Sequence, residues 1–235
     1  SDDSYITHRV VDNFVRGYGL VWNADERVQA YTHPLWFFIL SIGYVFYKNI
    51  FYVNILFSII ASTAVVVIFV SKISRSSFES LIGVLILTFS KSFIDFSTTG
   101  LENPLAHLIL ALFFLVYFRT ALSSKKLFLL SFIAGLGILT RLDFIILYLP
   151  CLIYILLQLH SYKEILTMIK GLSLFLTWEL FSLFYYGFFF PNTYYAKLNT
   201  KIDFGDYLQQ GVFYFIDSIL SDPITLLIVF AAIVL

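Results

Sequence analysis

The chain has 235 residues, of which 60% are hydrophobic and only 13% are charged, and its formal net charge is zero. A soluble domain is about half apolar and about a quarter charged, so this composition excludes an ordinary water-soluble globule. The sequence has no basic tract that would bind phosphates, and we expect no nucleic-acid partner. We therefore predict an all-α integral membrane protein.

The single cysteine and the two chain ends add further limits. Cys151 stands alone, which excludes an intrachain disulfide and a cysteine-based metal site. The chain begins at Ser1, its only methionine is Met168, and it stops at Leu235 inside an apolar run. We expect a fragment that lacks an N-terminal span and the C-terminal part of the protein.

A polar segment opens the chain and precedes the first apolar run. Residues 4–20 carry apolar side chains at helical spacing, chiefly Ile6, Val10 and Phe14, which predicts a helix lying on the membrane surface. After a polar turn, residues 34–47 predict a short apolar helix that begins at a proline. It is shorter than the roughly 20 residues that cross a bilayer, and we expect it to lie in the interface rather than span.

The later apolar runs predict a bundle of transmembrane helices. They cover 50–70, 79–94, 104–118, 127–140, 144–159, 171–189, 207–220 and 223–235. Several runs are short, as in bundles whose helices end inside protein. We divide the chain into a first extracytoplasmic loop with juxtamembrane helices, residues 1–48, and a multi-helix transmembrane bundle, residues 49–235.

Two kinds of loop alternate between these runs. The small basic loops comprise 72–75, 119–126 and 160–170, and the polar loops comprise 91–103, 140–143 and 190–206. Basic loops are typical of the cytoplasmic side, whereas the polar set mixes both charges with Gly, Pro, Thr, Asn and Tyr. We expect the polar loops and residues 1–33 to share one extracytoplasmic surface.

Two adjacent acids open the chain. Asp2 and Asp3 are either ordinary solvent-exposed loop acids or the general base of a reaction at the membrane boundary. A general base must lie within hydrogen-bond reach of an acceptor hydroxyl, and a neighbouring like charge helps to tune its pKa. Neighbouring side chains in an extended chain point apart, so we expect the two acids to differ in role.

Three cations are candidates for binding a phosphate. Arg9 lies on the predicted surface helix, Arg141 lies between two apolar runs, and Lys197 follows the PNTYYA segment. An arginine offers bidentate donors to phosphate, although Arg9 is equally suited to contact lipid headgroups. Arg141 with Asp143 is either a functional pair or a structural ion pair at a span junction.

Further polar side chains in the same loops are candidates for binding a sugar substrate. Amide, hydroxyl and aromatic groups commonly hold sugars, although Tyr and Lys also form interfacial belts. The candidates are His8, Tyr31, His33, Glu102, Asp143, Asn192, Thr193 and Tyr195. Glu102 is alternatively a helix cap before Pro104. The histidines have no ligand spacing, so no metal site is assigned, although a divalent ion is not excluded.

Taken in order, four segments resemble the GT-C superfamily of polytopic glycosyltransferases. They are residues 2–40, TTGLENPL, TRLD and PNTYYAKL. The likeness is greatest to the branch that contains the mycobacterial terminal arabinofuranosyltransferase. Relatives often carry Asn where this chain has His33.

This resemblance implies a membrane enzyme that transfers a sugar with inversion from a polyprenyl-phosphate donor to an acceptor hydroxyl. It assigns the general-base role to Asp2 and Asp3. It also implies that Gly100–Glu102, Arg141–Asp143 and Pro191–Thr193 line the donor and acceptor cavity. No further cofactor is expected beyond this lipid-linked donor.

The expected partners are a polyprenyl-phosphate sugar, a cell-envelope glycan or lipid acceptor, and membrane lipids. The expected location is the bacterial inner membrane, with the site facing the periplasm or exterior. The alternative is a transporter or flippase for a lipid-linked sugar, which needs no base. Such proteins usually have repeated halves, and no repeat is visible in this sequence.

Overall fold

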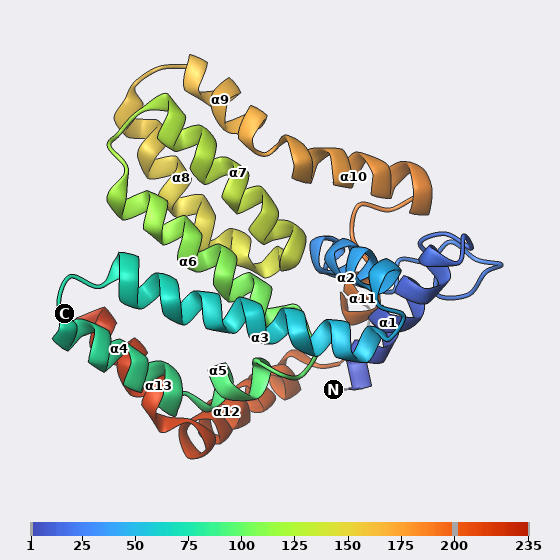
Figure 1. Ribbon diagram of the computed structural model, residues 1–235, viewed down its shortest axis with the longest axis horizontal. Helices are drawn as coiled ribbons and strands as arrows, with labels where there is room; N and C mark the ends of the chain where they lie inside the picture. Colours follow the sequence, from blue (N-terminus) through green and yellow to red (C-terminus); the bar gives the residue numbers. More distant parts are fainter. Residues whose placement is uncertain (1, 199–201, 235) are drawn as a thin grey trace.

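The computed structural model is helical throughout the part of the chain that it describes, residues 2–198 and 202–234 (Figure 1). Within that part, the side chains of 196–198, 224 and 232–234 are not described. The helices that frame the site are α1 (Asp2–Val15), α2 (Pro34–Phe46), α3 (Ile50–Ile68), α6 (Asn103–Arg119), α7 (Ser124–Thr140), α8 (Ile145–Leu159), α10 (Ser173–Tyr186) and α11 (Asn192–Leu198). The others are η1 (Phe69–Ile73), α4 (Ser77–Phe89), α5 (Lys91–Phe96), η2 (Leu142–Phe144), α9 (Lys163–Gly171), α12 (Phe204–Ser221) and α13 (Pro223–Val234). The predicted all-α class is confirmed.

The helix ends follow ordinary capping chemistry. The side chains of Asn49, Ser76 and Ser123 each accept a hydrogen bond from a backbone N–H in the first turn of the next helix. Pro34 begins α2, where a missing N–H costs nothing. Gly187 ends α10 with φ +82°, a left-handed conformation that favours glycine. The apolar runs therefore became helices close to their predicted bounds.

Three short helices lie in segments that were predicted as loops. They are α5, α9 and α11. In α5 the hydroxyl of Ser90 caps the first turn by accepting from the N–H of Phe93, a local signal that hydropathy does not register. α9 is bent by 63° from α10, so the segment predicted as a single run over 171–189 is the second half of a bent pair.

Helix α7 is the centre of the bundle. It packs against α6 and α8, which run beside it in Figure 1, and it also packs against α9. A Cβ at Gly171 would lie 2.8 Å from the carbonyl oxygen of Phe128, so only glycine lets α9 approach α7 this closely. Phe113 of α6, Leu130 of α7 and Tyr148 of α8 fill the space between these helices.

A second core fixes the N-terminal helix against the bundle. Val10 and Val11 of α1 are fully buried against Phe37 and Leu40 of α2. Ile6 and Phe14 of the predicted apolar face are exposed, whereas Ser4, Thr7 and His8 are buried on the side of α1 that meets the protein. Buried polar groups need partners, so the face of α1 that meets the protein carries hydrogen bonds as well as apolar contacts. The helix ends at Val15, two residues before Gly17, whose φ of +88° is not helical.

The protein is a multi-pass membrane protein. Ile50–Ile73 and Leu142–Leu159 are each long and apolar enough to cross a bilayer. The bent pairs Lys163–Gly171 with Ser173–Tyr186, and Phe204–Ser221 with Thr225–Ala231, pass the same test if each is one span. At 13 residues α2 belongs to the shorter apolar helices, as expected.

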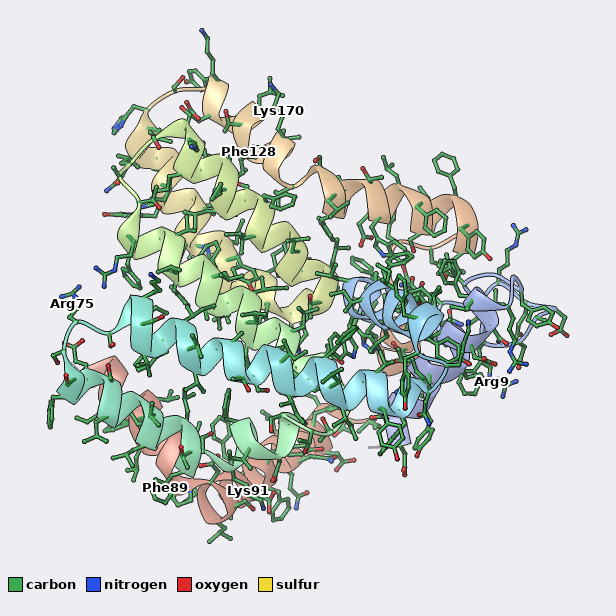
Figure 2. All side chains as sticks on the ribbon, viewed as in Figure 1. Arg9, Arg75, Phe89, Lys91, Phe128 and Lys170 are labelled. Carbon is green, nitrogen blue, oxygen red and sulfur yellow. The ribbon has the colours of Figure 1, made fainter. Side chains whose placement is uncertain are left out.

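The basic loops lie together, away from the N-terminal helix. Arg119 donates to the carbonyl oxygen of Ile73 at 3.4 Å, and Ser124 donates to Glu164 at 2.6 Å. Figure 2 shows Arg75 at the left edge of the molecule and Lys170 at its top, both far from Arg9 at the right. This grouping agrees with the predicted alternation of loops.

Candidate functional site

A series of polar contacts joins four segments that are far apart in the sequence. The Thr7 hydroxyl lies 2.7 Å from His33 Nε2, and His33 Nδ1 lies 3.2 Å from a Glu102 oxygen. The other Glu102 oxygen lies 3.5 Å from an Arg141 nitrogen. An ionised carboxylate only accepts, so His33 Nδ1 carries the proton and Nε2 accepts from Thr7. These contacts thus link α1 to the start of α2, the start of α6 and the end of α7.

His33 is held uncharged in this series of contacts. Burial lowers the pKa of His33, the Glu102 carboxylate opposes that shift, and the Arg141 guanidinium adds to it. The neutral ring both donates and accepts, which suits the two partners on its opposite edges. His33 therefore fixes the distance between α1 and Glu102.

A second set of contacts positions the loop before Glu102. Asn54 of α3 donates to His8 Nε2 at 2.6 Å and to the carbonyl oxygen of Gly100 at 2.7 Å. Gly100 has φ +82°, and a Cβ there would lie 3.0 Å from Asn54 Nδ2. The TTG turn therefore needs its glycine, and it brings Glu102 back toward α1.

Arg141 is surrounded by acceptors. Its Nε and Nη2 donate to the two oxygens of Asp143 at 3.0 and 2.8 Å, and Nη1 donates to Asn103 at 2.8 Å. With Glu102, these contacts engage all three guanidinium nitrogens. The hydrogen bonds to Asp143 raise the pKa of Arg141, so its positive charge is fixed in place.

The main cavity of the site, about 400 Å³, opens beside this cluster. Among the predicted residues Glu102, Arg141, Asp143 and Thr193 line it. Sequence reasoning missed other lining residues, among them Gln29, Trp178, Glu179 and Phe190. The lining holds three carboxylates and one guanidinium, so the cavity is more acidic than basic.

Gln29 holds the segment Pro191–Thr193 beside the main cavity. Its side-chain oxygen accepts from Ser182 of α10 at 3.1 Å, and its carbonyl oxygen accepts from the N–H of Asn192 at 3.4 Å. Gln29 and Thr193 also line a smaller cavity of about 290 Å³, next to Asn192 and Trp22. The three polar loops and the first loop thus meet on one side of the molecule.

The two acids lie at the N-terminal end of α1. Asp2 and Asp3 are exposed in its first turn, where the helix dipole favours negative charge. They are helical rather than extended, and neither lines the main cavity. Asp3 lies one turn before Thr7, and Asp2 lies one turn before Ile6, which lines the smaller cavity.

Of the three predicted phosphate ligands, only Arg141 is seen to line the main cavity. Arg9 is exposed, donates to Asn23 at 3.1 Å and stacks over Trp22 at 4.4 Å. Trp22 in turn lines the smaller cavity. The side chain of Lys197 lies outside the described part of the structure.

Several predicted substrate-binding residues are placed elsewhere. His8 and His33 are buried in the contacts described above, and Tyr31 is 1% exposed. Tyr31 stacks on Phe37 at 4.7 Å and lies 3.2 Å from the hydroxyl of Tyr186, so it is a core residue in this structure. Tyr195 is exposed beside Phe188 and does not line the main cavity.

No group of three or more His, Cys, Asp or Glu side chains that could hold a metal ion occurs among the described residues. Glu179 was the clearest signal missed, because a charge inside an apolar run is a functional candidate by itself. Gln29 and Trp178 carried no such signal, since neither is ionisable.

Comparisons with known proteins agree with the resemblance expected from the sequence. Residues 32–185 match the family described as dolichyl-phosphate-mannose-protein mannosyltransferase. The chain is also 29% identical over 233 residues to the terminal β-(1→2)-arabinofuranosyltransferase of Mycobacterium tuberculosis (strain ATCC 25618 / H37Rv). This match covers 91% of the chain and 36% of the relative, so the chain spans about a third of that protein's length. No solved structure matches the chain.

The contact between His8 and Asn54 predicts a pH-dependent stability. Burial lowers the pKa of His8 to about 4, below the value of about 6.5 in an unfolded chain. The unfolded state therefore takes up the proton first, and stability present above about pH 6.5 is lost as the pH falls toward 4. We expect the melting temperature of the purified protein to fall between pH 7.5 and pH 5, because protonation of this group lowers the free energy of unfolding by up to about 1.4 kcal/mol per pH unit.

His8→Gln keeps an acceptor for Asn54 but cannot titrate in this range, so its melting temperature should depend less on pH. His160→Asn, at an exposed position with φ +50°, is the matched control and should keep the wild-type profile. An unchanged profile in His8→Gln would contradict the assignment.

Proposed function

The chain belongs to the dolichyl-phosphate-mannose-protein mannosyltransferase family, and from this premise we propose that it carries the sugar-transfer site of a membrane glycosyltransferase. The observation that carries the proposal is the convergence of Glu102, Arg141, Asp143 and Thr193 on one cavity beside the N-terminal helix. Acidic side chains at a membrane boundary suit an acceptor hydroxyl that must lose a proton.

The donor is a polyprenyl-phosphate sugar. The family description names dolichyl-phosphate-mannose, which is a sugar on a polyprenyl-type phosphate, and the mycobacterial relative is named for an arabinofuranosyl group. A lipid phosphate is a leaving group that needs no nucleotide. The acceptor is a hydroxyl of a cell-envelope glycan or lipid.

Asp2 or Asp3 acts as general base in this mechanism. The acceptor oxygen attacks the anomeric carbon from the side opposite the lipid phosphate, the bond from that carbon to the phosphate oxygen breaks, and the configuration inverts. The carboxylate takes the hydroxyl proton. The contact from Thr7 to His33 supports this role because it anchors α1 within two turns of both acids.

The phosphate is held by Arg9 and Lys197, with a smaller part for Arg141. Asp143, Asn103 and Glu102 accept four hydrogen bonds from Arg141, so only one of its five N–H donors, on Nη2, is left for a phosphate. Arg9 stacks its guanidinium on Trp22, which lines the smaller cavity. Arg141 then acts chiefly by positioning the two carboxylates.

We also propose how the chain sits in the bacterial inner membrane. Residues 1–48 form an extracytoplasmic region and residues 49–235 form the bundle. The cavity faces the periplasm or exterior, and the basic loops face the cytoplasm.

The general-base role predicts that Asp2→Asn with Asp3→Asn abolishes transfer in the full-length enzyme. Loss of a general base costs about 10²- to 10⁴-fold in rate. Purified enzyme is assayed with polyprenyl-phosphate arabinofuranose and polyprenyl-phosphate mannose, and the single variants show which acid reacts. Asp25→Asn, an exposed acid of the first loop, is the control. Activity within a few-fold of wild type in the double variant would refute the role.

The orientation predicts which engineered cysteines are accessible from outside. In a Cys151→Ser background, Thr98→Cys and Thr193→Cys should react with a membrane-impermeant maleimide on intact cells or spheroplasts. Ser124→Cys and Ser161→Cys should react only after permeabilisation. All four positions are exposed, so a difference reports the side of the membrane rather than burial. The reverse pattern would overturn the orientation.

A further inference from the structure

Glu179 lies in the middle of α10 and lines the main cavity. Its neighbours in sequence are Trp178 and Leu180, so it is a charged side chain within an otherwise apolar helix. It is half-buried on the helix face that also carries Trp178 and Ser182. Ser182 is held by Gln29, which fixes this face of α10 toward the cavity.

The other two carboxylates of the cavity are already engaged. Glu102 contacts His33 and Arg141, and Asp143 accepts two hydrogen bonds from Arg141. Glu179 makes no hydrogen bond or ion pair with any described side chain or backbone group. A carboxylate at such a position is costly unless it gains partners, which points to a ligand that supplies donors.

The surroundings of Glu179 limit what that ligand is. A phosphate is disfavoured, because the carboxylate would repel it and Arg141 is already occupied by acids. A metal ion is not supported, because no cluster of candidate ligands occurs among the described residues. A sugar hydroxyl donates the hydrogen bond that Glu179 lacks, and Trp178, Phe190 and Tyr194 line the same cavity with aromatic surface.

We infer that Glu179 is a substrate-binding residue whose carboxylate accepts a hydrogen bond from a sugar hydroxyl in the main cavity. This inference rests on the proposed glycosyltransferase function and extends it to a residue on α10. The hydroxyl belongs either to the sugar of the donor or to the acceptor glycan, since both carry the same chemistry.

The test pairs Glu179 variants with substrates that lack single hydroxyls. Full-length enzyme in nanodiscs is assayed with polyprenyl-phosphate arabinofuranose, polyprenyl-phosphate mannose, and a synthetic arabinofuranose oligosaccharide as acceptor. Whichever donor the wild type uses is then replaced by its mono-deoxy forms in one arm, and the acceptor by its mono-deoxy forms in the other. The enzymes compared are wild type, Glu179→Gln, Glu179→Ala and Glu164→Gln, a control carboxylate on the neighbouring helix α9 that binds Ser124 outside the cavity.

Glu179→Ala should lower kcat/KM for the intact substrates by about 10- to 100-fold, the usual effect of a hydrogen bond to a charged group. For the wild type, removal of one particular hydroxyl from the substrate should lower kcat/KM by a similar factor. For Glu179→Ala, the same deoxy substrate and the intact substrate should have equal kcat/KM. The arm in which that substrate occurs identifies donor or acceptor. Glu179→Gln should fall between wild type and Glu179→Ala, and Glu164→Gln should match wild type.

Thermal unfolding of the same variants separates binding from folding. Removing an unpaired charge from an apolar helix should leave the melting temperature unchanged or raise it, whereas a structural role would lower it. The inference is overturned if the melting temperature falls or if kcat/KM stays within about twofold of wild type. It is also overturned if every deoxy substrate lowers kcat/KM by the same factor in Glu179→Ala as in the wild type, since the two losses would then be independent. Absence of transfer by the wild-type enzyme would instead refute the proposed function, and the inference with it.

Discussion

The hydrogen-bonded series from Thr7 through His33 and Glu102 to Arg141 attaches α1 to the charged side chains of the main cavity. Its members are largely buried, and a buried polar group that loses its partner costs about 1–3 kcal/mol. Each link therefore holds the next in place. Because His33 is neutral, it connects a hydroxyl to a carboxylate without burying a further charge. These contacts thereby attach the amphipathic helix α1 to the bundle of apolar helices.

Most of the fold was predictable from hydropathy and capping. The predicted bounds are close to those observed for the apolar helices α2, α3, α6, α7 and α8. In a membrane, a long apolar segment must satisfy its own backbone hydrogen bonds, and a helix does this. The face of α1 was not predictable, since Thr7 and His8 look like solvent-facing residues until their partners His33 and Asn54 are known. Those partners are 26 and 46 residues away, and periodicity carries no information at that range.

The site was predictable where charges interrupt apolar runs. Glu102, Arg141 and Asp143 were expected to converge, and all three line one cavity. Tyr31 was placed at the substrate by its polar neighbours in sequence, but its ring is a core element stacked on Phe37. That outcome depends on three-dimensional packing, which residue type alone does not specify. The roles of Asp2 and Asp3 depend on the family resemblance, because both side chains are exposed and outside the main cavity.

The most direct measurement of the central claim is a double-mutant cycle between the two ends of the His33 contact. Thr7→Val, Glu102→Gln and the combined variant are compared with wild type in chemical unfolding of the purified protein in detergent micelles. Since both side chains act through one imidazole, the account predicts a coupling free energy of about 0.5–3 kcal/mol. Effects that add to within about 0.3 kcal/mol would contradict it, because they would mean that α1 and Glu102 are held independently.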